Sequence, residues 1–437
     1  MEVQEVFLWE STPSQKSLPS PSMKFDDYRI SPEIKRNLEG MGLKRPTDIQ
    51  FKSIPAILKG EDVLAIAQTG TGKTAAFAIP ILHMLQSKKH SSRSEGIKCV
   101  VMVPTRELSI QITEVFEKIG KHTKVKIFSV FGGVEQDPQI ARLEKGIDIL
   151  VTTPGRMFDL VSQGHIHLER VEILVLDEAD HMLDLGFIKD IRDLIKFLPR
   201  NRQTLFFSAT INEKIKTLAY SLVRGAAIRI QVSPKDPVAK NITHSVAFIE
   251  MDDKRFFLAR LIEENPESKI LVFVRTKVRA ERVSKALERA GVQSITIHGD
   301  KDQQDRLKVM QQFREGSVKV LIATDVSARG IDIPDVDFVV NYDLPDVAEN
   351  YVHRVGRTGR GIKKGLAVSF CSTEERPMLA EIEAFLSKPI TVQTIAKDDY
   401  AETVILHDER SDKMKALMAE IEEAEKWERK SRKRKKL

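Results

Sequence analysis

Cysteines and long apolar runs are scarce in this 437-residue sequence, and each scarcity excludes a class of protein. Only two cysteines occur, Cys99 and Cys371, which excludes a disulfide framework and a cysteine-rich zinc site and favours a reducing cytosolic setting. The longest apolar runs, such as residues 270–274, are far shorter than the ~18 residues that a membrane span needs. The first ten residues lack a basic start and an extended apolar stretch, so we expect no secretory signal.

Excess positive charge is confined to one end of the chain. The net charge is +6, and residues 429–437 hold seven Lys or Arg and no acid, so the other 428 residues sum to −1. Three interpretations of this tail stay open: a solvated end, a nuclear-import signal, and a sequence-independent tether for nucleic acid, whose phosphates release counterions when they are neutralised. A basic patch elsewhere must come from local arrangement rather than from composition.

The chain alternates short apolar runs with helix-length segments in two series. Runs that are apolar on both faces indicate parallel strands covered on both sides. We expect strands at 63–67, 99–103, 127–130, 147–152, 173–176 and 204–208, then at 246–249, 270–274, 294–297, 320–323, 338–341 and 367–370.

These series predict two doubly wound α/β domains of similar plan. Residues 1–22 are rich in Ser and Pro and indicate a flexible lead-in, whereas 233–241 is polar with two prolines and indicates a linker. We therefore expect domains at 23–232 and 242–395, followed by a charged helix at 410–430 and the basic tail within 396–437.

A glycine-rich loop follows the first predicted strand and precedes a predicted helix. Gly70 and Gly72 allow backbone N–H groups to point at phosphate oxygens, and the helix adds its positive end. Lys73 can reach the β- and γ-phosphates, and the Thr74 hydroxyl can bind Mg²⁺. The usual pattern has Gly where Ala67 stands, and a turn without a chemical role is the alternative. The predicted phosphate-binding residues are Ala67, Gln68, Thr69, Gly70, Thr71, Gly72, Lys73 and Thr74.

Acidic residues appear abruptly where the strand at 173–176 ends. This position lies at the carboxyl edge of a parallel sheet, where α/β folds bind ligands. Asp177 is suited to hold Mg²⁺ through water, and Glu178 to orient and deprotonate an attacking water. A solvated acidic turn is the alternative for an isolated string of this kind.

The loop together with Asp177-Glu-Ala-Asp180 resembles the DEAD-box ATP-dependent RNA helicases, most closely their compact, short-tailed bacterial members. The resemblance spans about residues 25–390 and implies two RecA-like domains. It makes Gln50 the adenine-reading amide and Phe25 an aromatic ring that stacks on the base, which predicts ATP over GTP. By themselves these two residues would be a helix-surface residue and a core anchor. The coupling positions that it implies are Asp180, Ser208, Thr210 and His353.

In the second domain, the resemblance makes Arg357 and Arg360 arginine fingers that stabilise charge on the γ-phosphate. It places Asp332 on the ribose. Helix starts and glycine pairs that follow strands are suited to phosphates, so the implied RNA contacts are to the sugar–phosphate backbone. The predicted RNA-binding residues are Thr105, Arg106, Gly133, Thr153, Arg156, Arg275, Thr276, Gln303, Arg306, Thr324 and Asp325.

The sequence therefore predicts an enzyme that couples ATP hydrolysis and closure of two domains to local unwinding of RNA. An ATP-gated RNA clamp with little unwinding is the alternative, and a DNA translocase is disfavoured by Gln50 and the acidic motif. The expected cofactors are ATP and Mg²⁺, and the expected ligands are single-stranded RNA and short duplexes. We expect a cytoplasmic monomer without membrane contact, associated with ribosome-assembly or RNA-decay machinery.

Deleting residues 429–437 tests whether the tail is a tether, because it removes seven positive charges and no predicted catalytic residue. RNA affinity should fall and its salt dependence should become shallower, since the single-strand slope is about −0.7 per phosphate neutralised. ATPase activity at saturating RNA and preference among RNA sequences should not change. RNA titrations at several salt concentrations measure this, and equal slopes for both proteins would leave the tail a solvated end or a localisation signal.

Overall fold

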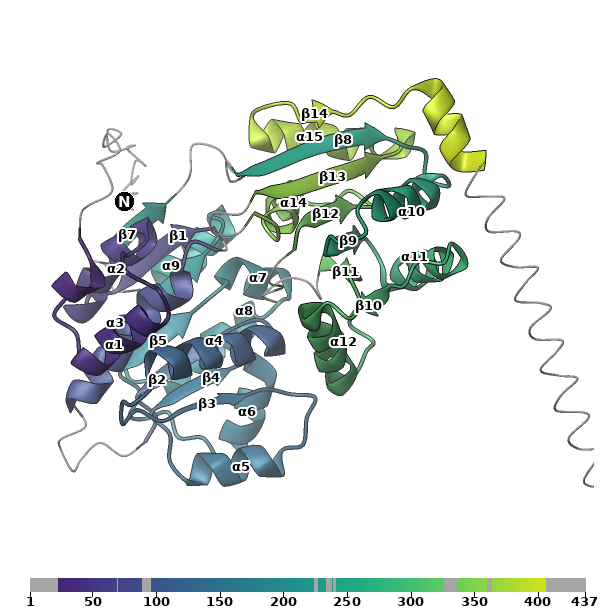
Figure 1. Cartoon of the computed structure of the whole chain (residues 1–437). Helices are drawn as coiled ribbons and strands as arrows, with labels where there is room; N and C mark the ends of the chain where they lie inside the picture. The colour runs from purple at the N-terminus through teal and green to yellow at the C-terminus, as the bar shows by residue number, and fades with distance from the viewer. Residues whose placement is uncertain are drawn as a thin grey trace, which may run out of the picture.

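The computed structural model of the protein describes residues 23–68, 70–88, 96–223, 227–232, 238, 241–325, 333, 336–359 and 364–405. Within them, two layered α/β units lie side by side, as Figure 1 shows. The predicted helix at 410–430 and the basic tail lie outside these residues. None of the helices in the described ranges has the length and apolarity that crossing a bilayer requires.

The first unit is built on a seven-stranded parallel sheet in the order β3-β4-β2-β5-β6-β1-β7. Its central strands are apolar on both faces, because helices cover both sides of the sheet. Six strands lie within two residues of the predicted bounds. The strands are β1 (Val63–Ala67), β2 (Cys99–Met102), β3 (Ile127–Val130), β4 (Ile149–Thr152), β5 (Ile173–Leu176), β6 (Gln203–Ser208) and β7 (Ile228–Val232).

Two groups of helices cover the faces of this sheet. One group packs with the side chains of Val63, Ala65 and Ala67 and consists of α1 (Pro32–Gly40), α2 (Asp48–Leu58), α3 (Lys73–Lys88) and α4 (Arg106–Ile119), with the short 3-10 helix η1 (Phe25–Asp27) beside them. The other group packs with Leu64 and Ile66 and consists of α5 (Asp137–Glu144), α6 (Pro154–Ser162), α7 (Ala179–Asp184), α8 (Ile188–Phe197) and α9 (Glu213–Leu222).

The second unit repeats the plan of the first. Its parallel sheet has the order β10-β11-β9-β12-β13-β8-β14, which is the order of the first sheet with seven added to each number. This confirms the prediction of two similar doubly wound folds. The strands are β8 (Ile242–Phe248), β9 (Ile270–Val274), β10 (Ile295–Ile297), β11 (Val320–Thr324), β12 (Phe338–Asn341), β13 (Gly365–Cys371) and β14 (Thr391–Val392).

Helices again cover both faces of the sheet. One face packs against α12 (Gln303–Glu315), α14 (Ala348–Val355) and α15 (Arg376–Leu386), with the 3-10 helix η2 (Thr373–Glu375) before α15. The other packs against α10 (Lys254–Glu264), α11 (Lys277–Arg289) and the helical residues 397–405. Tyr400 donates a hydrogen bond to Asp253 (2.7 Å), so packing of the second unit continues past residue 395, where we expected it to end.

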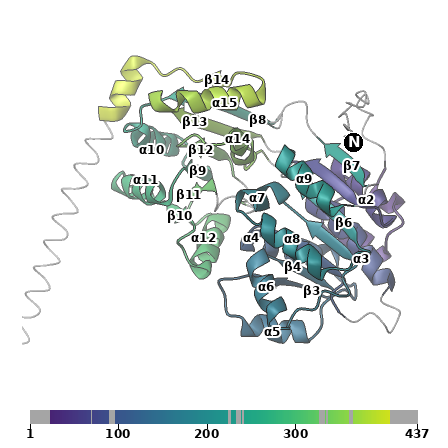
Figure 2. The same cartoon turned by 180° about the vertical axis from the view of Figure 1, so that it is seen from behind.

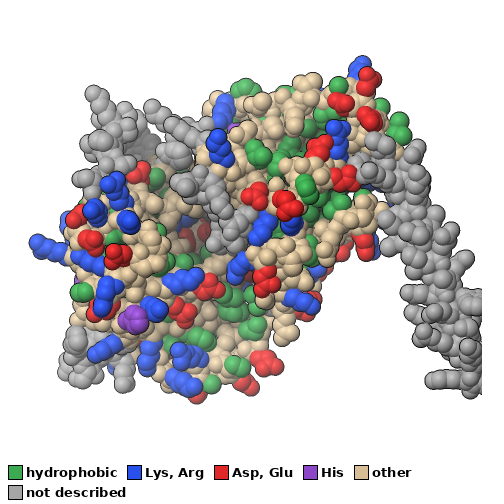
Figure 3. Space-filling model, viewed as in Figure 1, with side chains coloured by type: hydrophobic (Ala, Val, Ile, Leu, Met, Phe, Trp, Pro, Cys, Tyr) green, Lys and Arg blue, Asp and Glu red, His purple; other side chains and the backbone are tan. Residues whose placement is uncertain are grey.

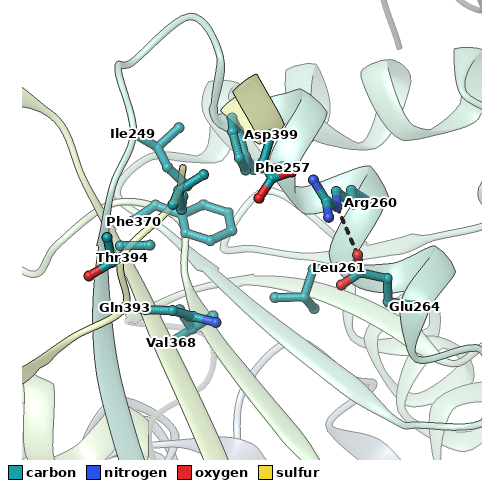
Figure 4. A pocket seen from close by; sticks show the side chains of 12 residues that line it. Ile249, Phe257, Arg260, Leu261, Glu264, Val368, Phe370, Gln393, Thr394 and Asp399 are labelled. Carbon is teal, nitrogen blue, oxygen red and sulfur yellow. Dashed lines mark hydrogen bonds and ion pairs between the residues drawn. The ribbon is translucent and has the colours of Figure 1, made fainter. Parts of the chain in front are cut away.

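A cavity of about 210 Å³ lies where residues 393–399 cross the sheet beside α10 (Figure 4). Apolar side chains such as Phe257 and Phe370 line it, and an ion pair between Arg260 and Glu264 lies at its side. None of the predicted site residues lines this cavity. In the view of Figure 3, acidic and basic side chains both occur on the surfaces of the two units.

A fully buried ion pair organises the carboxyl edge of the second sheet. Lys254 (0% exposed) contacts the carboxylate of Glu375 (1% exposed) and donates a hydrogen bond to the carbonyl of Tyr342 (2.7 Å). The same carboxylate accepts hydrogen bonds from the N–H groups of Leu344 and Ser372, both at 3.1 Å. Burial lowers the pKa of Lys254, and the Glu375 carboxylate opposes this effect.

Replacing Glu375 with Gln should destabilise the second unit by about 3–5 kcal/mol, because it leaves a buried ammonium without a counter-charge. The double variant Lys254→Met, Glu375→Gln should recover most of that loss. Urea unfolding measures both. As a control, Glu267→Gln breaks the exposed pair with Lys319 and should leave the midpoint nearly unchanged. A Glu375→Gln protein as stable as the control would contradict a structural role for the buried pair.

Candidate ATP and RNA sites at the carboxyl edges of the two sheets

Strand order brings the predicted site residues together. In the first sheet β5, β6 and β1 are neighbours, and their carboxyl ends carry the acidic motif, the Ser208–Thr210 segment and the phosphate loop. The strands β3, β4 and β2 are also neighbours, and the residues that follow them are the predicted RNA contacts of this unit. One edge of one sheet therefore carries the predicted nucleotide-binding residues in one half and the predicted RNA contacts in the other.

The phosphate loop runs from the end of β1 into α3. Gly70 and Gly72 have φ values of 80° and 90°, a backbone region that favours glycine. The Thr71 hydroxyl donates to the carbonyl of Gln68 (2.7 Å), which closes the loop on itself. Ala67 is buried at the end of the strand, where its side chain packs in the core. Thr69 lies outside the described residues.

Two features of the loop fit a bound triphosphate. Lys73 is 7% exposed, and its buried ammonium has no hydrogen-bond partner among the described residues. Lys73 is also the first residue of α3, so the positive end of that helix faces the same place. An unpartnered buried ammonium at a helix start is the arrangement that phosphate oxygens satisfy. Thr74 follows it, half-buried at the same helix start.

Gln50 is joined to this loop, whereas Phe25 is not open to a ligand. The Gln50 amide donates to the Gly72 carbonyl (3.1 Å) and its oxygen accepts from Thr47 N–H (2.9 Å). A Cβ at position 72 would lie 2.4 Å from the Gln50 nitrogen, so only glycine admits this contact. Phe25 is 3% exposed and packs in the core beside α1 and α2. This is the role of a core anchor, which the sequence left as the alternative to stacking on a base. Stacking on a base would require this ring to be uncovered.

The acidic motif places two carboxylates in different electrostatic environments. Burial raises the pKa of Asp177 to about 6, although the nearby Lys73 opposes the shift. Burial also acts to raise the pKa of Glu178, but His181, Lys73 and Arg357 outweigh it and hold the value at about 2. Glu178 is therefore ionised at neutral pH. Its backbone is left-handed (φ 52°), an uncommon conformation for this residue type at the start of α7.

Asp180 links the acidic motif to the end of the neighbouring strand β6. Its Oδ2 accepts hydrogen bonds from Ala209 N–H (3.1 Å), Thr210 N–H (2.9 Å) and the Thr210 hydroxyl (3.0 Å). The Ser208 hydroxyl donates to the Thr210 carbonyl (2.8 Å). The three predicted coupling residues of the first unit thus form one hydrogen-bonded group.

His181, which directly follows the acidic motif, lies beside the carboxylate of Glu178. It is 5% exposed, and its Nδ1 is 3.5 Å from a carboxylate oxygen of Glu178. Neither ring nitrogen has a hydrogen-bond partner within the described part of the chain. A buried imidazole therefore lies against Glu178.

The predicted RNA contacts of the first unit surround a pair of glycines. The Arg106 guanidinium lies against Gly133, where an added Cβ would be 1.9 Å from it. Arg156 donates to the Val134 carbonyl (2.9 Å) in the same loop. Thr105 and Thr153 are the N-caps of α4 and α6, and the Thr105 hydroxyl accepts from Leu108 N–H (3.3 Å).

Residues of the second unit contact both groups of predicted site residues at this edge of the first sheet. Arg306 of α12 lies 2.8 Å from the carboxylate of Glu107 on α4, and both views of the molecule place these helices side by side (Figures 1 and 2). Burial lowers the pKa of Arg106, as do the charges of Arg306 and Arg156, while Glu107 opposes the shift. Predicted RNA-binding arginines from both units therefore form one cluster.

In the nucleotide half, Arg357 is buried and close enough to act on the charge of Glu178. Its Nε–H donates to the carbonyl of His353 (3.2 Å) on the last turn of α14. Asp332 and Arg360 lie outside the described residues. A guanidinium of the second unit thus acts on the acidic motif of the first.

Two predicted RNA contacts of the second unit are already paired within it. Asp325 accepts two hydrogen bonds from Arg354 (2.6 and 2.7 Å), which is 2% exposed. Arg275 lies 3.0 Å from Asp346 and 3.4 Å from Glu375. The carboxylate of Asp325 therefore positions Arg354, and contact with RNA would have to use other atoms or displace these pairs.

The remaining predictions in this unit lie at the same edge. Thr276 caps α11 by accepting from Arg279 N–H (3.1 Å), and Thr324 ends β11 as a buried residue. Gln303 is the first residue of α12, and its side chain is not among those described. The sequence did not single out Arg354, Glu375 or Glu107, because their partners are distant along the chain.

A self-contained metal cluster is not found in the described ranges, where no three His, Cys, Asp or Glu side chains are placed to bind an ion. Mg²⁺ does not need one, because it keeps several waters and is bound by one or two carboxylates together with substrate phosphates. Asp177 beside the phosphate loop fits that donor set.

Comparison with known families matches the two units separately. The DEAD/DEAH box helicase family matches residues 47–218, and the helicase conserved C-terminal domain matches residues 253–361. The ATP-dependent RNA helicase RhlB of Shewanella frigidimarina is 41% identical over 379 residues, 86% of this chain and 87% of that protein. The DEAD-box ATP-dependent RNA helicase CshA of Bacillus cereus is 42% identical over 82% of this chain and 67% of its own length.

Solved structures give the same result. Dbp5 of S. cerevisiae, bound to RNA and ADP BeF3, is 30% identical with a TM-score of 0.76, covering 89% of this chain and 99% of that one. The DEAD-box helicase Mss116, bound to ssRNA and UDP-BeF, is 28% identical with a TM-score of 0.79, covering 89% and 84%.

Proposed function

The chain belongs to the DEAD-box family of ATP-dependent RNA helicases, and we propose that it couples ATP hydrolysis to domain closure and local unwinding of RNA duplexes. The observation that carries this proposal is the pairing of sites along one edge. Nucleotide groups follow β5, β6 and β1, RNA groups follow β3, β4 and β2, and the second unit supplies arginines to both.

Hydrolysis is assigned to the acidic motif. Glu178 orients the attacking water and accepts its proton, a role supported by its burial beside Lys73 and its ionised state. The Lys73 ammonium neutralises charge on the β- and γ-phosphates. Asp177 and Thr74 would hold Mg²⁺, which neutralises charge developing on the phosphate oxygens.

Domain closure completes the nucleotide site. Arg357, together with Arg360, stabilises the charge on the transferring phosphoryl group, for which a planar guanidinium is suited. Because these residues belong to the second unit, hydrolysis requires both units to be in contact. Gln50 reads adenine, and Asp332 binds the ribose.

Coupling to RNA runs through Asp180 and the segment that it holds. A change at the acidic motif alters the acceptor for three donors at the end of β6, and so shifts Ser208 and Thr210. The RNA itself is held through its sugar–phosphate backbone by the arginine cluster of Arg106, Arg156 and Arg306.

An RNA clamp with little unwinding differs from this proposal in its hydrolytic step. Glu178 and Arg357 are both present at one site, where Arg357 is buried and Glu178 is partly buried, which favours turnover. We also propose that the protein acts as a cytoplasmic monomer on single-stranded RNA and short duplexes, within ribosome-assembly or RNA-decay machinery.

The change Glu178→Gln removes the base but keeps the shape of the side chain. It should leave affinity for ATP and RNA nearly intact while lowering RNA-stimulated turnover by at least ~10²-fold. ATP hydrolysis, duplex unwinding and equilibrium binding are measured on the same preparation. Near-normal hydrolysis by the variant would remove Glu178 from this role, and normal hydrolysis without unwinding by the native protein would favour the clamp.

Closure is measurable by energy transfer between fluorophores on the two units. Both native cysteines are buried, so cysteines introduced at the exposed positions Glu144 and Glu381 can be labelled selectively. Transfer efficiency should change only when single-stranded RNA and an unhydrolysed ATP analogue are both present. A second pair at Glu39 and Glu144, within the first unit, should not respond. An unchanged signal from the first pair contradicts closure.

A further inference from the structure

A basic groove lies on the second unit between α10 and α11, outside the sites described above. Its volume is about 320 Å³. Its floor contains Met251, Val283 and Ala286, and its only acidic lining residue is Asp252. Five cations line it: Arg255, Arg279, Arg282, Lys285 and Arg289.

The cations on α11 share one face of the helix. Arg279, Arg282, Lys285 and Arg289 are spaced by three or four residues, whereas Glu281 lies on another face, where it accepts a hydrogen bond from Thr296 (2.7 Å). Like charges at this spacing oppose helix formation. These four side chains therefore repel one another along one face of α11.

Most of this charge is not neutralised internally. Arg279 lies 3.6 Å from the carboxylate of Asp343, and Arg289 donates to the carbonyl of Lys285. Arg255, Arg282 and Lys285 are exposed, and no ion pair to another described residue is recorded for them. The groove is thus a positively charged surface, on which Arg282 and Lys285 are exposed and Arg255 lies over the ring of Phe256 (4.5 Å).

We propose that this groove binds a second stretch of single-stranded RNA, beyond the nucleotides held at the edge of the two sheets. Thr276, a predicted RNA contact, is the N-cap of the helix that carries the cations, and Arg279, one turn further along, already lines the groove. The cations bind phosphates, and the apolar floor takes the sugars and bases. This inference rests on RNA being the ligand of the enzyme.

The groove adjoins a predicted RNA contact, Thr276, and this favours RNA over an acidic peptide, the other polyanion that such a groove could bind. A strand already held at Thr276 reaches the groove as an intramolecular extension, which raises its effective concentration there. The added contacts are to phosphates, so they increase affinity without adding sequence preference.

The test is the length dependence of RNA binding by the full chain. The variant Arg282→Glu, Lys285→Glu reverses two exposed cations. Its control, Arg314→Glu, Lys397→Glu, makes the same charge change at two exposed positions of the second unit outside the groove. Each protein is titrated with oligo(U) of about 10 and about 25 nucleotides at several salt concentrations, with an unhydrolysed ATP analogue present.

The native protein and the control should bind the longer RNA more tightly, and the groove variant should lose most of that gain, about 5–10-fold. Its salt slope on the long RNA should be smaller by about 1.4, for two phosphates. Its affinity for the short RNA and its ATPase rate at saturating RNA should match the native protein.

Three outcomes overturn the inference: a groove variant that binds long RNA as the native protein does, a control that loses as much affinity, or an oligo-glutamate peptide that competes for the groove as well as RNA of equal charge. The last assigns the groove to an acidic peptide. If the native protein itself did not bind the short RNA, or if RNA did not stimulate its ATPase activity, the proposed function would be contradicted instead.

Discussion

The carboxylate of Asp180 is the interaction on which the arrangement of the site depends. It accepts three hydrogen bonds from Ala209 and Thr210, so the loop after β6 is held to the loop after β5. Parallel strands make this possible, because their carboxyl ends meet at one edge. A buried acceptor that faces three donors admits few other arrangements, since losing it would leave three donors unpaired. The acidic motif and the segment after β6 are therefore held to each other, so that a displacement of one would displace the other.

Most of the strands that the sequence predicted best lie inside their sheets, although β3 is at an edge. The bounds of β1, β3, β5, β9 and β12 agree with prediction to the residue. The strands that the sequence missed have the opposite character: β7 is largely exposed at a sheet edge, and β14 has two exposed residues. β14 is too short to show a pattern, whereas β7 does alternate apolar and polar residues (IRIQV), a signal that the prediction did not use. The helical residues 397–405 were missed because Tyr400 and Val404 form a short apolar stripe that the surrounding charge conceals.

Site residues were predictable wherever the chemistry is local in sequence. The phosphate loop and the acidic motif each need contiguous residues, and both lie where the strand pattern placed them. Pairing across the fold was not predictable. Asp325 binds Arg354, 29 residues away, and Arg306 binds Glu107 of the other unit. Such partners depend on strand order and domain contact, neither of which a single sequence records. Phe25 shows the converse. Its position relative to the motifs predicts stacking on the base, whereas the structure buries its ring in the core.

Charge placement connects the two halves of the molecule. Outside residues 429–437 the chain sums to −1, so attraction to a polyanion depends on where its cations gather. The fold gathers Arg106, Arg156 and Arg306 from two units, and their mutual repulsion, together with burial, lowers the pKa of Arg106. Glu107 offsets part of that repulsion and binds Arg306. Bound phosphates would offset the remaining repulsion among these arginines. They could do so only while both units are in contact, because Arg306 belongs to the second unit. Under the proposed function, RNA would therefore stabilise the same contact that brings Arg357 to Glu178, and RNA binding and assembly of the nucleotide site would favour each other.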